Sequence, residues 1–165
     1  MSTRSYIFVE NEDGTLDGIY CHFDGYLDGV GTVLLKSYNG AENEAKRQEL
    51  IGLGDLSCIG ASLETSPAVE MFGFDYFNDD RYLALSKHTQ SILNDSQDFI
   101  CTVAYHRDRG DEKQTANYES LEELLRSVSV HDFMMIAYIY IWHAGCWWVL
   151  QNGNLGKLEQ AIDKV

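Results

Sequence analysis

The chain has 165 residues, of which 26 are acidic and 12 are Lys or Arg, giving a formal net charge of −14 at pH 7. This excess of negative charge argues against direct binding to nucleic acid or to an anionic membrane, because both carry charge of the same sign. Hydrophobic residues make up 45% of the chain and aromatic residues 12%, so the composition predicts a packed core rather than disorder.

The first part of the chain predicts a β-hairpin followed by two helices. Tyr6–Val9 and Gly18–Phe23 are rich in β-forming residues and flank an Asp-Gly turn. Apolar residues recur at helical spacing over 27–38, and a second helix is expected over 42–53. The apolar residues of 56–63 are expected to form one more helical turn.

The middle of the chain predicts a second hairpin and a buried strand. Phe72–Phe77 and Tyr82–Ser86 are expected to pair around a polar turn, with 89–96 as a polar connector. Residues 98–106 are largely apolar on both alternating faces, which is typical of a core strand. A charged loop is expected over 107–118.

The last part predicts a helix, a further hairpin and a short C-terminal helix. Residues 120–123 read Ser-Leu-Glu-Glu, a capping-box sequence that begins a helix. Ile136–Trp142 and Cys146–Leu150 flank a short loop containing glycine, and they give the clearest strand signal of the chain. Apolar spacing over 155–162 predicts the final helix.

Strands that come as hairpins, with helices between them, predict an α+β fold: an antiparallel sheet with helices packed on one face. We expect a single domain over 1–165, with 64–97 as a candidate acidic flap or insertion. The N-terminus lacks the apolar stretch of a signal peptide, and no stretch reads as a membrane span. Four cysteines show no paired spacing, so a cytoplasmic protein with reduced thiols is expected; they are Cys21, Cys58, Cys101 and Cys146.

The segment from Glu64 to Asp80 interleaves acidic and aromatic side chains and contains no Lys or Arg. A row of carboxylates can mimic the phosphates of a nucleic-acid backbone, and neighbouring rings supply anchors for a protein interface. The segment is therefore predicted to bind a basic partner through Glu64, Glu70, Phe74, Asp75, Tyr76, Asp79 and Asp80. The competing interpretation is a solvated segment with Phe72, Phe74 and Phe77 in the core.

No motif fixes a reaction, so enzymatic activity is the less favoured class. Cys21, His22 and the residues 143–146 (His-Ala-Gly-Cys) offer a zinc donor set, but adjacent strand residues point to opposite faces. We therefore expect neither a metal nor another cofactor. The alternative function is a small cytosolic enzyme or ligand-binding domain that uses the Cys21-His22-Asp24 region with His106.

Residues 18–26 (GIYCHFDGY), followed by Val-Gly at 30–31 and Leu-Leu at 34–35, resemble a recurrent block in small acidic proteins of tailed phages and prophages. Residues 53–57 (LGDLS) fit the same block, and Phe23 stands where that group more often has Trp. The resemblance covers about the first third of the chain. It implies a phage or mobile-element origin and carries over no catalytic residue, because the group is mostly uncharacterised.

Small acidic proteins of mobile elements commonly act against host defence by stoichiometric binding. The resemblance and the charge together predict an inhibitor of the anti-CRISPR or anti-restriction type that acts as a DNA mimic. The expected partner is a basic nucleic-acid-binding protein or complex of a bacterial host, with no direct contact to nucleic acid or membrane. A structural or assembly protein of the phage is a third hypothesis, and the many aromatic rings leave a homodimer open.

Overall fold

The computed structural model describes residues 2–94, 98–130 and 135–164. The strands are β1 (Arg4–Glu10), β2 (Leu16–Cys21), β3 (Leu56–Cys58), β4 (Val103–Ala104), β5 (Ala116–Tyr118), β6 (Ile136–His143), β7 (Cys146–Gln151) and β8 (Asn154–Lys157). Within the described ranges they join into one sheet in the order β4-β3-β2-β1-β6-β7-β8, and β5 pairs with the start of β2. The β1–β6 and β2–β3 pairs are parallel, and the others are antiparallel.

Helices cover both faces of this sheet. They are η1 (Leu27–Gly31), α1 (Thr32–Ser37), η2 (Ala41–Asn43), α2 (Glu44–Gly52), α3 (Pro67–Phe72), η3 (Tyr76–Asn78), α4 (Asp80–Leu83), α5 (Lys87–Leu93), α6 (Tyr105–Arg109), α7 (Leu121–Val130) and α8 (Leu158–Asp163). On one face, Ile7 and Ile19 pack under η1, α1, α2 and α8. On the other face, Phe8, Leu16 and Ile141 pack under α7.

The α+β fold class is therefore confirmed, with two corrections to its details. The sheet is mixed rather than wholly antiparallel, because β1 reaches β6 in parallel after a long crossover. The helices do not all lie on one face, because the apolar stripe of α7 packs on the side opposite to α1, α2 and α8.

The first and the last hairpin expected along the chain are both confirmed, and turn chemistry explains them. β1 and β2 pair around Gly14, whose φ of 86° requires the left-handed region that glycine adopts easily. β6 and β7 pair around Ala144 and Gly145, with φ values of 52° and 78°, as a tight hairpin turn demands. The helices expected over 27–38 and 42–53 are also confirmed.

The predictions for residues 56–109 are mostly wrong. The expected helical turn after Leu56 contains strand β3, and the expected hairpin over 72–86 is replaced by α3, η3 and α4. Polar residues of types common in loops are helix N-caps here: Ser66 accepts from the Val69 N–H, and Asp79 accepts from the Arg81 N–H. The expected polar connector contains α5, capped in the same way by Ser86.

Two further segments differ from expectation because short non-local pairings decide them. Only Val103 and Ala104 of the expected core strand join the sheet; the chain turns at Phe99, with φ of 55°, and α6 begins at Tyr105. The expected C-terminal helix begins at Leu158 rather than Leu155, because 154–157 pair with β7 as strand β8.

The turn after β2 is held by close backbone approaches that only glycine permits. The Gly25 N–H donates to the Thr3 carbonyl at 2.8 Å, and the Tyr140 hydroxyl donates to the Gly25 carbonyl at 2.6 Å. A Cβ on Gly29 would lie well inside van der Waals contact with the Asp24 carbonyl oxygen. The glycines of the 18–31 block therefore serve the fold, and they fix the end of β2 in place.

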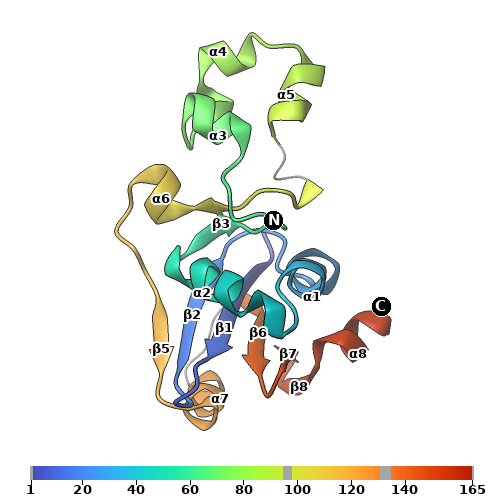
Figure 1. Cartoon of the computed structure of the whole chain (residues 1–165). Helices are drawn as coiled ribbons and strands as arrows, with labels where there is room; N and C mark the ends of the chain where they lie inside the picture. Colours follow the sequence, from blue (N-terminus) through green and yellow to red (C-terminus); the bar gives the residue numbers. More distant parts are fainter. Residues whose placement is uncertain (1, 95–97, 131–134, 165) are drawn as a thin grey trace.

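Helices α3, η3, α4 and α5 form a lobe that projects from the sheet beyond β3, as the green segments of Figure 1 show. We call residues 64–94 the helical lobe. Its interior is aromatic: Tyr82 is buried, and its ring centroid lies 4.9 Å from that of Tyr76 and 5.9 Å from that of Phe72. A single domain with an acidic insertion over 64–97 stays a prediction.

The chain segments that enter and leave the helical lobe run side by side, and we call 61–64 with 99–102 the stem. The Ala61 N–H donates to the Phe99 carbonyl at 2.8 Å, and the Thr102 N–H donates to the Glu64 carbonyl at 2.9 Å. The Thr102 hydroxyl also donates to the Ser62 carbonyl at 2.7 Å. These bonds tie the two ends of the helical lobe together at the edge of the sheet.

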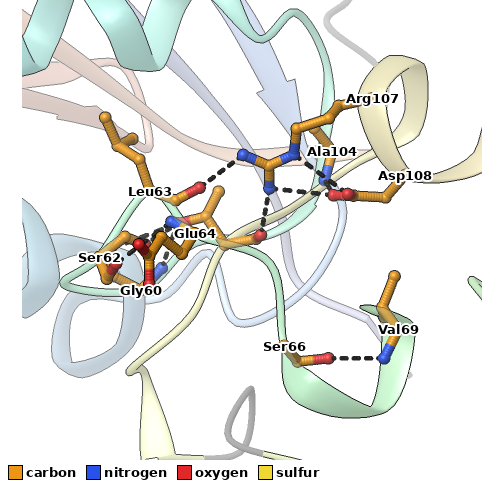
Figure 2. Close-up of polar contacts among 10 residues, drawn as sticks. Gly60, Ser62, Leu63, Glu64, Ser66, Val69, Ala104, Arg107 and Asp108 are labelled. Atoms are coloured by element: carbon orange, nitrogen blue, oxygen red, sulfur yellow. Dashed lines mark hydrogen bonds and ion pairs between the residues drawn. The ribbon is translucent and has the colours of Figure 1, made fainter. Parts of the chain in front are cut away.

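Arg107, from α6, binds both sides of the stem, as Figure 2 shows. Its guanidinium donates to the Leu63 carbonyl at 2.6 Å and to the Thr102 carbonyl at 2.7 Å. The same group forms an ion pair with Asp108 at 3.0 Å, and Asp108 in turn accepts from the Ala104 N–H at 2.8 Å. The network links the helical lobe to β4 and sets its position.

Candidate functional site

A cavity of about 510 Å³ lies between the sheet and the helical lobe, and we call it the lobe pocket. Its walls come from the end of β2, from β3 and β4, from α3 and the η3 region of the helical lobe, and from α6. The volume falls within the range of about 300–1,000 Å³ that is usual for small-ligand sites. The side chains that decide its chemistry are His22, Asp24, Cys58, Phe74, Tyr76 and Arg109.

Five aromatic rings line the lobe pocket: Phe23, Phe74, Tyr76, Phe77 and Tyr105. The Phe74 and Tyr105 ring centroids are 5.7 Å apart, and those of Tyr76 and Phe77 are 5.6 Å apart. Phe23 and Phe77 are exposed at 44% and 53%, although large rings usually avoid water. Three other hollows, of 380 to 530 Å³, are each lined by no more than one aromatic side chain.

His22 contributes a ring held by its neighbours. Its Nδ1 shares a hydrogen bond of 2.6 Å with the Tyr20 hydroxyl, and its ring meets the Phe23 ring edge-to-face at 4.5 Å between centroids. Partial burial, and secondarily the charge of Arg4, lower the pKa of His22 below its usual value. The imidazole is therefore mainly neutral near pH 7.

We expect the His22 imidazole to titrate below pH 6.5, the usual pKa of histidine. Because the folded state favours the neutral ring, the stability that His22 contributes is present above the unfolded pKa and is lost as the pH falls through the folded pKa. NMR titration of the ring Hε1 signal measures the midpoint. Arg4→Met should raise it slightly, and a wild-type midpoint above 6.5 would contradict the burial argument.

Asp24 supplies the acidic side chain of the lobe pocket. Its φ of 58° places it in the left-handed region, which Asp and Asn tolerate better than most residues. The Val30 N–H donates to its carbonyl at 2.8 Å, and the Tyr26 hydroxyl donates to its carboxylate at 3.0 Å. The backbone and side chain are thus both held, with carboxylate lone pairs left for a ligand.

Arg109 lies over two of the pocket rings. Its guanidinium carbon is 4.8 Å from the Phe74 ring centroid and 4.5 Å from that of Tyr105. Asp111 pairs with the same guanidinium through two hydrogen bonds of 3.0 and 2.6 Å. The positive charge of Arg109 is therefore offset by a neighbouring carboxylate and a pair of aromatic faces.

The thiols near the lobe pocket are not activated. Cys21 is fully buried in the core on the opposite face of β2, and burial raises the pKa of its thiol. Cys58 lines the pocket, but burial raises its pKa to about 11. Both groups are thus protonated thiols near neutral pH, and a protonated thiol is a poor nucleophile.

The alternative site predicted from the sequence is assembled only in part. His22 and Asp24 meet in the lobe pocket, whereas Cys21 points into the core. His106 is exposed on α6 with its Nδ1 2.7 Å from the Asp111 carbonyl oxygen, and it does not line the pocket. The four residues therefore do not line one pocket, and the use of this region as an enzyme or ligand site stays a prediction.

The cysteine and histidine donors considered for zinc are also not brought together. Cys21 is in the core, and His143, at the β6–β7 turn, pairs with Glu10 at 2.9 Å. In the part of the chain that the structure describes, no group of three or more His, Cys, Asp or Glu side chains could hold a metal ion.

The residues predicted to bind a partner fall into two groups. Phe74 and Tyr76 line the lobe pocket, as described above. The acids on the surface of the helical lobe are Glu64, Glu70, Asp75, Asp79 and Asp80, and all but the half-buried Asp79 are exposed. Asp79 pairs with Arg81 at 2.9 Å, which lowers the pKa of its carboxyl to about 2. Arg81 therefore offsets the Asp79 charge locally.

Sequence reasoning missed several residues that the structure places at this site. Ser57, Tyr105 and Arg109 line the lobe pocket; Ser57 ends the 53–57 segment of the recurrent block, whereas nothing in the local sequence marks Tyr105 or Arg109. Phe23 did carry a signal, since it is the aromatic position inside the 18–26 block. The helical lobe and the stem also expose large apolar side chains that were not predicted: Met71, Phe77, Leu83, Ile92 and Ile100.

Comparison with known proteins found no matching family model, no matching curated protein and no matching solved structure. Among the described helices, none combines the length and the apolar character needed to cross a membrane.

Proposed function

We propose that this protein is a phage or mobile-element counter-defence factor that binds stoichiometrically to a basic, nucleic-acid-binding protein or complex in the cytoplasm of a bacterial host. In this proposal the protein is an inhibitor of the anti-CRISPR or anti-restriction type and acts as a DNA mimic. The observation that supports it is the helical lobe, which exposes acidic and large apolar side chains together.

The charges of the helical lobe suit a basic partner. Residues 64–94 contain five acidic side chains against Arg81 and Lys87, and Arg81 is paired with Asp79. Glu70, Asp75 and Asp80 are exposed. An acidic surface on a chain of net charge −14 attracts a positively charged groove over a distance of about 8–10 Å at physiological salt.

The exposed apolar side chains of the helical lobe indicate that its partner is a protein surface, because small counter-ions would gain nothing from apolar contacts. Of the eight large hydrophobic side chains that are exposed among the described residues, five lie at the helical lobe and stem. Their exposed fractions run from 46% for Ile100 to 58% for Met71. Apolar anchors surrounded by charge are the usual composition of a protein interface, with the charges setting association rate and specificity.

The experiment compares two triple charge reversals that change the net charge equally. Glu70→Lys, Asp75→Lys and Asp80→Lys alter the helical lobe, whereas Glu49→Lys, Glu112→Lys and Asp163→Lys alter exposed acids elsewhere. We expect the wild type to restore phage plating on cells carrying a nuclease-based defence. The lobe variant should lose this effect and bind the isolated defence complex about 100-fold more weakly, because like charges then face each other.

The control triple should keep both plating and affinity within about threefold, since distant surface charges contribute little. Equal losses in the two variants would show that only net charge matters. Unchanged affinity in the lobe variant would remove the helical lobe from the interface. Repeating the binding measurement at about 50 and about 300 mM salt should show a weaker salt dependence for the lobe variant.

The lobe pocket favours a second candidate function, that of a small ligand-binding domain. His22 and Asp24, which the sequence analysis assigned to a ligand site, lie together in a cavity of ligand size. The thiols beside them are protonated, so binding is better supported than covalent catalysis.

A further inference from the structure

We propose that the lobe pocket is a receptor for a guanidinium group, and that its occupant is an arginine side chain presented by the basic partner. The identity of the occupant rests on the proposed function, because that function supplies a partner rich in arginine. The preference for guanidinium rests on the pocket itself.

The aromatic walls give the first argument. A cation is attracted to the face of an aromatic ring, and several rings around one cavity form a cage for it. Arg109 shows that these rings accept a guanidinium, since it already lies over Phe74 and Tyr105 at 4.8 and 4.5 Å. No described Lys or Arg is placed over the rings of Phe23 or Phe77, which remain exposed at the pocket rim.

The charge of the lobe pocket gives the second argument. Asp24 contributes a carboxylate, and the charge of Arg109 is offset by Asp111. Since His22 is mainly neutral near pH 7, the pocket carries a negative balance inside a strongly acidic protein. A phosphate or carboxylate ligand would meet this repulsion, whereas an organic cation would not.

The shape of the ligand gives the third argument. A guanidinium is planar, so it can lie flat against a ring while its edge donates two hydrogen bonds to one carboxylate. Asp24 comes from the sheet side of the pocket and Phe77 from the helical lobe, so the same cavity offers both a carboxylate and an aromatic ring. The round ammonium of lysine offers neither the flat face nor the paired donors.

The stem network holds the base of the helical lobe in place before any ligand binds. Arg107 joins the Leu63 and Thr102 carbonyls and thereby ties the stem to α6, the helix that also supplies Arg109 to the pocket. A site that is formed before binding avoids the cost of ordering its walls.

The test is an NMR titration of the whole protein with N-acetyl-arginine methylamide, followed on the aromatic side-chain signals. We expect saturable shifts at Phe23, Tyr76 and Phe77. The citrulline analogue, which has the same shape but no charge, and the lysine analogue should each bind at least about tenfold more weakly. Asp24→Asn should also weaken arginine binding about tenfold, and it preserves the fold because Asn tolerates the same positive φ.

A matched pair of variants in the helical lobe tests whether arginine binds in the lobe pocket. Phe77 and Leu83 are exposed at 53% and 56%, but only Phe77 lines the lobe pocket. Phe77→Ala should weaken arginine binding at least about fivefold, and Leu83→Ala should leave it unchanged. Equal effects of the two variants would place the ligand elsewhere on the helical lobe.

The outcomes separate this proposal from the proposed function. Absent arginine binding, or equal binding of citrulline or lysine, overturns the guanidinium receptor, while the charge-reversal experiment still decides the proposed function. Arginine binding that depends on Asp24 and Phe77 supports the receptor, even where the lobe charge reversals leave the defence complex bound.

Discussion

Gly29→Ala is expected to lower the free energy of unfolding by about 3 kcal/mol, a large fraction of the stability of an ordinary domain. The new methyl group would press on the Asp24 carbonyl oxygen and on the Tyr26 ring. The Asp24 carbonyl also accepts from the Val30 N–H, so the turn cannot move aside without losing that bond. Urea denaturation followed by tryptophan fluorescence measures the change.

Gly52→Ala is the matched control for this prediction. Gly52 ends α2, and a Cβ there would meet no atom within 4 Å. Alanine should therefore be neutral or stabilise the protein by up to about 1 kcal/mol, as expected for a helical glycine with free space. A Gly29→Ala protein as stable as wild type would show that the turn after β2 can relax.

Arg107→Ala is expected to release the helical lobe while the sheet stays folded. The substitution leaves the Leu63 and Thr102 carbonyls without their donor and removes the ion-pair partner of Asp108, whose side chain is 5% exposed. We expect the free energy of opening the stem to fall by about 2 kcal/mol. Hydrogen exchange of the 61–64 and 99–102 amides should then accelerate about thirtyfold, with exchange in β1 and β6 unchanged.

The control for Arg107 is Arg81→Ala, which lies within the helical lobe itself. Arg81 pairs with a carboxylate two residues away and lies 5.2 Å from the Phe72 ring centroid, and its side chain is 70% exposed. Its removal should change the hydrogen-exchange rate of the same stem amides by less than about twofold, because exposed ion pairs contribute little to stability. Similar acceleration in both variants, or acceleration that extends through β1, would contradict a role of Arg107 as the local clasp.

Local rules predicted the parts of the fold that local residues decide. The β1–β2 and β6–β7 hairpins follow from glycine turns between β-forming segments, and α7 follows from Ser120, whose hydroxyl accepts from the Glu123 N–H at 3.1 Å. Strands β3 and β5 are only three residues long, and their partners lie on distant β2. Such short segments carry no periodic signal, so their pairing depends on the finished core.

The helical lobe shows how one residue type can support two interpretations. Ser66, Asp79 and Ser86 are common both in turns and at helix N-caps, and the structure uses them as caps. The composition of the lobe pocket was hidden in the sequence for a different reason. His22 with Asp24 belonged to one hypothesis and Phe74 with Tyr76 to another, and only the packing of the helical lobe on the sheet brings them together.

The stem allows the helical lobe to change in length and sequence while the sheet stays the same. The Ala61 N–H donates to the Phe99 carbonyl, so the 37 residues between them are an insertion whose two ends meet at one point beside the sheet. Doubling the length of an insertion closed in this way lowers the free energy of unfolding by only about 0.6 kcal/mol, through the entropy of loop closure. The same sheet can therefore carry inserted lobes of different length and sequence, so that binding specificity can change while the fold is kept.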